Sequence, residues 1–221
     1  MKKIALVLFV VAVAGVLIAD PIGMHWLIFF CKPLIMASLL VYYFVSAEPL
    51  ERSGSLMLAL IFSLAGDAFL ISQDYFIPGL IAFLLAHLLY ILAYRQHRHE
   101  ESENALMGLQ RVRLAFPIIL AATGLVIILY PVLGGLKIPV IIYASVLALM
   151  AIAALFRYGR TSPVSFWMVF GGAVLFMVSD SILAINKFLE PLPNAGFWIM
   201  TTYSAAQYMI VKGLLSHPVK D

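Results

Sequence analysis

The sequence has few charges and a single cysteine, and each shortage excludes a class of protein. Charged residues make up 11% of the 221 residues, against roughly 25% in a soluble protein. So few charges cannot cover a water-facing surface, which excludes a soluble enzyme, a nucleic-acid-binding protein and a disordered tail. The one cysteine, Cys31, excludes an internal disulfide bond and a metal site built from several cysteines.

Several motifs of common enzyme chemistry are also missing. The chain has no Gly-x-Ser-x-Gly turn and no phosphate-binding loop, so a serine hydrolase is not expected. Of the five histidines, only His87 lies inside an apolar segment. A catalytic zinc site would need His87 together with two aspartates from other segments, which is the less favoured interpretation. No metal and no cofactor are therefore predicted.

Long hydrophobic runs are what the sequence does have. Hydrophobic residues make up 64% of the chain, and a spanning helix needs about 20 mainly apolar residues. The runs lack strand-like alternation, which argues against a transmembrane barrel. We expect an all-α integral membrane protein, a single transmembrane domain over residues 1–221, with eight transmembrane helices: Ile4–Ala19, Trp26–Ser46, Ser55–Ile71, Phe76–Tyr94, Leu114–Tyr130, Ile138–Phe156, Phe166–Lys187 and Phe197–Leu215.

The first apolar segment has a second interpretation. Lys2-Lys3, an apolar run and the small residues Ala12-Val13-Ala14 also fit a cleaved signal peptide. The apolar run continues past the small residues to Ala19, which favours a helix that is retained.

The distribution of Lys and Arg predicts the orientation. If the N-terminus is cytoplasmic, eleven basic residues lie on the inner side and three on the outer side, the bias typical of cytoplasmic loops. We therefore expect both termini to be cytoplasmic. The short loops and the lysine-rich start are typical of a multi-pass protein of the bacterial inner membrane. The three outer lysines, which each need an explanation, are Lys32, Lys137 and Lys187.

The two halves of the chain resemble each other weakly. Residues 1–95 and 114–215 are joined by one long polar loop, Arg95–Arg113, of about 19 residues. Asp67 lies in an Ala-Gly-Asp-Ala context in the first half, and Asp180 lies in a Val-Ser-Asp-Ser context in the second. Four helices in each half would give two parallel repeats, which place binding sites where the halves meet.

Asp67 and Asp180 are the strongest candidates for function. A carboxyl group inside a spanning segment is costly and usually functional. Asp67 lies about 12 residues and Asp180 about 14 residues into its segment, so both reach a similar depth in the outer half of the bilayer. Of two desolvated carboxyl groups close together, one can hold a proton at neutral pH, which gives an acid and a base. The alternative is that each carboxyl group only joins helices through a hydrogen bond.

Other polar residues are predicted to converge on the same level. Lys32 and Lys187, with the adjacent Asn186, could hold a phosphate group as point charges, or the lysines could extend to the interface as snorkelling side chains. Lys137 is interpreted as a snorkelling residue. The remaining side chains expected at the substrate site are His87, Tyr90, Tyr143, Tyr203 and Gln207.

The motifs together resemble those of a known family. The set is Lys32-Pro33-Leu34, Gly66-Asp67, Ala86-His87-x-x-Tyr90, Pro139-x-x-x-Tyr143, Ser179-Asp180 with Lys187-Phe188, and Tyr203-x-x-Ala206-Gln207. It resembles the YhhN-type lysoplasmalogenase family. The resemblance implies a multi-helix membrane hydrolase that cleaves the vinyl ether bond of a lysophospholipid, releasing a fatty aldehyde and glycerophosphoethanolamine or glycerophosphocholine.

The predicted acid–base pair suits this chemistry. A vinyl ether is hydrolysed by protonation at its β-carbon followed by addition of water, so one Asp would be the acid and the other would activate water. The expected partners are thus a lysophospholipid and the lipid bilayer, with no nucleic acid. The alternative is a proton-coupled transporter or lipid flippase that uses the buried Asp pair. A lipid-binding scaffold is a third interpretation, which would leave both aspartates unexplained.

Overall fold

The computed structural model describes residues 1–99, 102 and 104–217 of the chain. Within these residues the regular structure is helical, with no β-strand. Short 3-10 turns precede α3, α4 and α6. The eight α-helices are α1 (Lys2–Ala19), α2 (His25–Ser46), α3 (Gly54–Phe69), α4 (Phe76–Gln96), α5 (Leu109–Leu129), α6 (Lys137–Leu155), α7 (Pro163–Phe188) and α8 (Ala195–Leu215).

The prediction of an all-α membrane protein is confirmed. Six helices, α1, α2, α4, α5, α6 and α7, are long and apolar enough to cross a membrane. Helix α3 is apolar but has only 16 residues. Helix α8 has 21 residues, and its polar residues include Thr201, Thr202, Ser204 and Gln207. Helices α3 and α8, which differ from a standard span, are therefore also the helices that carry several of the polar residues described below.

The polar loop between the halves is shorter than the predicted Arg95–Arg113. Helix α4 continues to Gln96 and α5 begins at Leu109, so residues 97–108 connect them. The predicted bounds were placed where the apolar runs end. A helix can extend beyond an apolar run, because its bounds are set by its backbone hydrogen bonds. The basic residues at these ends can follow the helix because their long side chains reach the aqueous interface. Arg111 also donates from Nε to the carbonyl oxygen of Leu106 at 2.6 Å.

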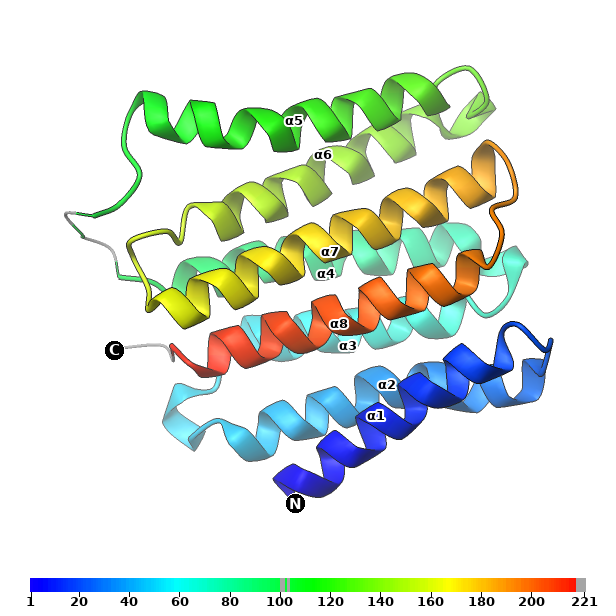
Figure 1. Ribbon diagram of the computed structural model, residues 1–221, viewed down its shortest axis with the longest axis horizontal. Coiled ribbons are helices and arrows are strands. Elements are labelled where there is room, and N and C mark those ends of the chain that lie inside the picture. The colour runs from blue at the N-terminus through cyan, green and yellow to red at the C-terminus, as the bar shows by residue number, and fades with distance from the viewer. Residues whose placement is uncertain (100–101, 103, 218–221) are drawn as a thin grey trace.

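The helices alternate in direction, so α1 begins and α8 ends at the same end of the bundle (Figure 1). Each helix packs against the next in sequence, except that α4 packs on α6 rather than on α5. Helix α8 also packs against α1 and α2. Side chains of α3 and α8, and those of α4 and α7, meet through polar and aromatic contacts. Polar side chains therefore lie in the middle of the bundle.

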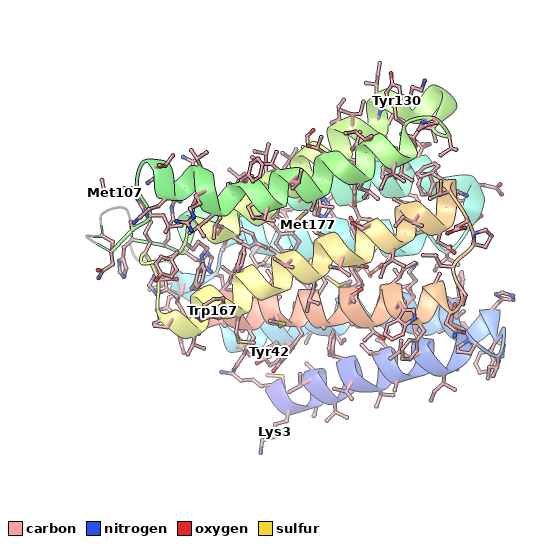
Figure 2. All side chains as sticks on the ribbon, turned by 45° about the horizontal axis from the view of Figure 1, so that its top comes forward. Lys3, Tyr42, Met107, Tyr130, Trp167 and Met177 are labelled. Carbon is pink, nitrogen blue, oxygen red and sulfur yellow. The ribbon has the colours of Figure 1, made fainter. Side chains whose placement is uncertain are left out.

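Small residues let the helices approach closely, as is usual in membrane bundles. A side chain at Gly172 on α7 would bring its Cβ to 2.9 Å from the backbone oxygen of Ala206 on α8. Outward-facing side chains along the helices are largely apolar, which suits contact with lipid (Figure 2). The fully buried alanines at helix contacts include Ala12, Ala59, Ala86, Ala93, Ala151, Ala154, Ala173 and Ala206.

A buried arginine joins three helices at the end of the bundle that holds the termini. Arg157, just after α6, has no exposed surface. Its Nη2 donates to the carbonyl oxygen of His97 at 2.9 Å and to Ser165 Oγ at 2.8 Å. Ser165 Oγ in turn donates to the carbonyl oxygen of Gly213 at 2.7 Å. The ends of α4 and α8 and the start of α7 are thereby fixed to one another.

A methyl group at Gly172 should destabilise the protein. We expect Gly172→Ala to push α7 and α8 apart at a cost of about 1–3 kcal/mol, and so to lower the thermal unfolding midpoint in detergent by several degrees. The matched control is Gly124→Ala on α5, because a Cβ there would meet no atom within 4 Å. Equal midpoints for the two variants would contradict the close α7–α8 packing.

The stability of the protein should depend on pH through His97, which lies beside the buried Arg157. Burial lowers the pKa of His97 to about 4, although its Nδ1 bonds the carbonyl oxygen of Ala93 at 2.8 Å. The unfolded chain, with a His pKa of about 6.5, takes up this proton first, so stability is complete above pH ~6.5 and falls toward pH ~4 by roughly 3 kcal/mol.

This dependence can be measured by unfolding the protein at a series of pH values. His97→Gln should lose much of the decrease between pH ~6.5 and pH ~4, because glutamine does not titrate. His25→Gln, at an exposed position at the start of α2, is the control and should keep the wild-type profile. An unchanged profile in His97→Gln would assign the decrease to other groups.

Candidate active site

Asp67 and Asp180 line one cavity. The cavity has a volume of about 1140 Å³ including its open mouth, and its walls include residues of α2, α3, α4, α7 and α8. Asp67 lies in the last turn of α3, and Asp180 lies eight residues before the end of α7. Because α3 and α7 run in the same direction (Figure 1), both carboxyl groups are near the end of the bundle opposite the termini. The sequence predicted this common level.

Asp67 is held by a tyrosine from the other half of the chain. Its side chain is buried, with 2% of the residue exposed. Tyr203 on α8 donates its hydroxyl hydrogen to Asp67 Oδ2 at 2.8 Å. The preceding residue, Gly66, faces the ring of Phe83 on α4, and a Cβ at Gly66 would lie 2.6 Å from that ring. The glycine therefore lets an aromatic wall of the cavity close over α3 beside the carboxyl group.

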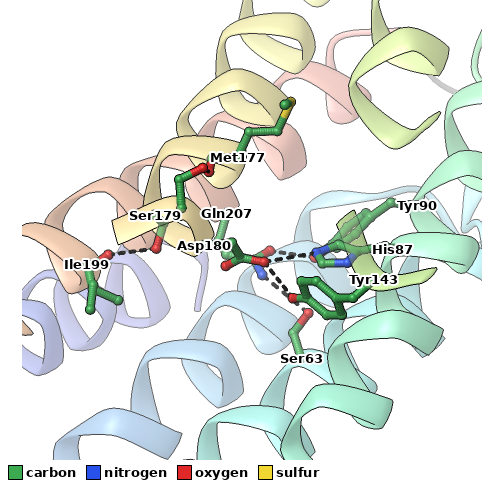
Figure 3. A network of polar contacts seen from close by, with 10 residues as sticks. Ser63, His87, Tyr90, Tyr143, Met177, Ser179, Asp180, Ile199 and Gln207 are labelled. Carbon is green, nitrogen blue, oxygen red and sulfur yellow. Dashed lines mark hydrogen bonds and ion pairs between the residues drawn. The ribbon is translucent and has the colours of Figure 1, made fainter. Parts of the chain in front are cut away.

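Asp180 has a tyrosine and a histidine beside it, as Figure 3 shows. Tyr143 on α6 donates its hydroxyl hydrogen to Asp180 Oδ2 at 2.5 Å. His87 Nε2 on α4 lies 4.0 Å from the same oxygen. The His87 ring is completely buried against the rings of Tyr143 and Phe176. Neither of its nitrogens has a hydrogen-bond partner, so Asp180 is the polar group that this histidine faces.

Two lysines lie in the wall of the same cavity as the carboxyl groups. Lys32 on α2 and Lys187 on α7 both line it, together with Asn186. Lys187 Nζ lies 5.2 Å from the ring centre of Phe76, another residue of the wall. Asn186 Oδ1 accepts a hydrogen bond from the backbone of Leu192 at 2.9 Å, which positions the α7–α8 connection. The predicted grouping of Lys32, Asn186 and Lys187 is therefore present.

Lys137, the third lysine at this end, does not line the cavity. Its Nζ lies 4.4 Å from the ring centre of Tyr130, at the end of α5. An ammonium group over an aromatic face is an attractive arrangement at an interface, and it agrees with the interpretation of Lys137 as a snorkelling residue.

Tyr90 and Gln207 occupy a different position from the one predicted. Both are completely buried, and neither is among the residues that line the cavity. Tyr90 donates its hydroxyl hydrogen to Gln207 Oε1 at 2.5 Å, and Gln207 Nε2 donates to Ser63 Oγ at 3.2 Å. These hydrogen bonds join α4, α8 and α3 (Figure 3). Polar residues one turn apart share a helix face. This pattern did not distinguish residues that line the cavity from residues that join the surrounding helices to one another.

Asp20 is a residue of the cavity that sequence reasoning missed. It lies between α1 and α2 and lines the cavity, as Lys32 does. Its carboxylate oxygens lie against the first turn of α8, where a Cβ at Gly196 would come within 2.4 Å of both. The positive end of a helix dipole favours an acidic group there. Asp20 is followed by Pro21, a pair typical of a turn between two helices, and no helical spacing connects it with Lys32.

The fold and this cavity define a helical membrane protein whose cavity holds two carboxyl groups from spanning helices together with two lysines. Two carboxyl groups in one cavity can share the roles of acid and base, and the described residues contain no group of three or more His, Cys, Asp or Glu side chains that could hold a metal ion. The YhhN family model matches residues 27–214, and the chain belongs to this family.

Curated relatives carry the name lysoplasmalogenase. The human lysoplasmalogenase TMEM86B is 36% identical over 161 residues, which are 73% of this chain and 63% of the relative. The human lysoplasmalogenase TMEM86A is 33% identical over 175 residues, 76% of this chain and 67% of the relative. A lysoplasmalogenase of Mycobacterium tuberculosis is 32% identical over 190 residues, 82% of this chain and 69% of the relative. The chain thus spans a little under two thirds of the human TMEM86B protein. No solved structure matches the chain.

The supporting role of Gln207 can be tested by a double-mutant cycle. Gln207→Met leaves the buried Tyr90 hydroxyl without its acceptor, which should cost about 1–3 kcal/mol of stability. In a Tyr90→Phe background the same change should cost less, with a coupling energy of at least ~0.5 kcal/mol. The measurement is chemical unfolding in detergent of the wild type, both single variants and the double variant. Additive effects would show that the two side chains do not support each other.

Proposed function

We propose that this protein is a lysoplasmalogenase, a membrane hydrolase that cleaves the vinyl ether bond of a lysophospholipid. The observation that carries the proposal is that Asp67 and Asp180 line the same cavity. The relatives' names support the substrate class. The products are a fatty aldehyde and a glycerophospho-base.

The two aspartates form the catalytic pair. One carboxyl group gives its proton to the β-carbon of the vinyl ether, and the electron pair of the double bond forms the new C–H bond. The α-carbon becomes part of an oxocarbenium ion. Water attacks this carbon, and the other carboxylate takes a proton from that water molecule. The resulting hemiacetal then loses the glycerol oxygen as an alcohol and leaves the aldehyde. In this step the second carboxyl group protonates the departing glycerol oxygen, and the first carboxylate takes the hydroxyl proton of the hemiacetal. One water molecule is consumed, and both aspartates return to their starting protonation states.

The side chains around the pair support these roles. Tyr143 and Tyr203 each donate a hydrogen bond to one aspartate, which fixes the direction of its remaining oxygen. Lys32, Lys187 and Asn186 at the mouth suit the phosphate of the substrate. His87 faces Asp180 from the apolar side and limits its rotation. Tyr90 and Gln207 act through the helices that they join.

The membrane disposition is part of the same proposal. All eight helices cross the bilayer, including the short α3 and the more polar α8, because they alternate in direction in one bundle (Figure 1). The end where α1 begins and α8 ends carries ten of the thirteen Lys and Arg residues that the structure describes, so it is cytoplasmic by the positive-inside rule. The cavity then opens toward the outer side of a bacterial inner membrane.

The proposed parallel repeat is supported by matching helix contacts. Helix α1 packs on α2, α2 on α3 and α3 on α4, and the same three contacts join α5 to α6, α6 to α7 and α7 to α8. Between the halves, α2 packs on α8 and α6 packs on α4. Asp67 and Asp180 lie in equivalent helices, so the repeat accounts for their matched depth.

The proposal is tested with purified protein in detergent. The wild type is incubated with an alkenyl lysophosphatidylethanolamine, and the released aldehyde is followed with a coupled dehydrogenase. Asp67→Asn and Asp180→Asn should each lower kcat by about 10²–10⁴-fold, because asparagine can neither give nor take the proton.

The matched control is Asp74→Asn, an exposed aspartate at the same end of the bundle and outside the cavity lining. It should keep wild-type activity. Full activity in Asp67→Asn or in Asp180→Asn, with the variant shown to be folded, would refute the paired mechanism. No aldehyde from folded wild-type protein would refute the hydrolase and direct attention to proton-coupled transport, which proton flux in liposomes would measure.

A further inference from the structure

A second cavity lies on the other side of Asp180. It is lined by residues of α4, α5, α6 and α7 near the same end of the bundle, and its space, including the part that is open to the outside, is about 620 Å³. Its wall is formed almost entirely by apolar side chains such as Leu80, Leu125, Leu129 and Leu147. We name it the apolar chamber. Of the site residues predicted from the sequence, Tyr143 and Asp180 are the two that line this chamber.

Asp180 connects the chamber with the polar cavity. It is the one titratable carboxyl group in the described wall of the chamber, where it is bonded to Tyr143, and it also lines the polar cavity. Phe76, Phe83 and Leu183 are shared by both walls in the same way. Asp67, by contrast, belongs only to the polar cavity. The two spaces are therefore adjacent, one polar and one apolar, and Asp180 and these three side chains, together with Leu70, form the wall that they share.

We propose that the apolar chamber binds the alkenyl chain of the substrate and so places the vinyl ether bond beside Asp180. This proposal rests on the proposed function. In a lysoplasmalogen the vinyl ether is the junction between the hydrocarbon chain and the polar glycerophospho-base. An apolar chamber, a carboxyl group and a polar cavity with two lysines follow one another in the same order as the parts of this molecule. Asp67 then faces the junction from the headgroup side.

The chamber also borders a groove on the outer face of α5 and α6. Val126 and Ala144 line both the chamber and this groove, whose other residues include Ile119, Ala122 and Leu149. Leu149 is exposed on the apolar surface of the bundle. A chain in the chamber therefore points toward the bilayer, which gives the hydrocarbon a lateral path without contact with water. The aldehyde product can leave along the same path.

The first test detects chain binding without catalysis. The probe is a 1-O-alkyl lysophosphatidylethanolamine with a diazirine near the end of its chain, which lacks the double bond and is not hydrolysed by this route. After illumination of the detergent-solubilised protein, we expect labelling of α5 and α6 between residues 125–129 and 140–147. An excess of unlabelled 1-O-alkyl lysophosphatidylethanolamine should remove this labelling and leave the non-specific labelling of lipid-facing surfaces.

The second test changes the size of the chamber. Ala184 on α7 lines the chamber and not the groove, so Ala184→Leu fills part of it. We expect kcat/KM for a hexadecenyl lysophospholipid to fall about 10-fold relative to that for an octenyl one. The matched control is Ala121→Leu, at an exposed position on α5 outside both walls, which should keep the wild-type ratio.

The outcomes separate this proposal from the proposed function. Competed labelling in the chamber without any aldehyde from the wild type would overturn the hydrolase while supporting the chain site. Aldehyde release with competed labelling confined to other helices would overturn the chamber and support the hydrolase. An unchanged chain-length ratio in active Ala184→Leu would also overturn the chamber.

Discussion

The cost of placing two carboxyl groups among apolar helices is the constraint on which the site depends. An unpaired polar group in such surroundings costs several kcal/mol. Each aspartate therefore has its own hydroxyl donor, Tyr203 for Asp67 and Tyr143 for Asp180. These bonds link α3 to α8 and α6 to α7, so satisfying the carboxyl groups also fixes the helices that form the cavity.

The polar contacts cross between the halves of the chain. Asp67 in the first half is bonded by Tyr203 in the second, and Asp180 in the second half faces His87 in the first. Behind them, Gln207 joins Tyr90 and Ser63. Because both carboxyl groups depend on both halves, neither half would form the cavity alone. The small residues at the α7–α8 contact allow this arrangement by keeping the backbones close.

The division of the site into polar and apolar parts follows from the same packing. The cavity with Lys32 and Lys187 lies on one side of Asp180, and the apolar chamber lies on the other. A lysophospholipid has the same division along its length. The proposed chemistry takes place where the two parts meet, at the carboxyl group that lines both.

The sequence by itself determined the membrane class and the approximate helix bounds, and it selected Asp67 and Asp180 as the candidates for function, because long apolar runs and intramembrane carboxyl groups are local signals. It also grouped Lys32, Asn186 and Lys187 at one end. Only the tertiary structure decided which polar residues line the cavity. Tyr90 and Gln207 turn away from it to bond each other, Asp20 enters it from a loop, and four helices close the chamber around Asp180. Helical spacing shows which residues share a face, but the neighbouring helix determines whether that face meets a cavity or a partner.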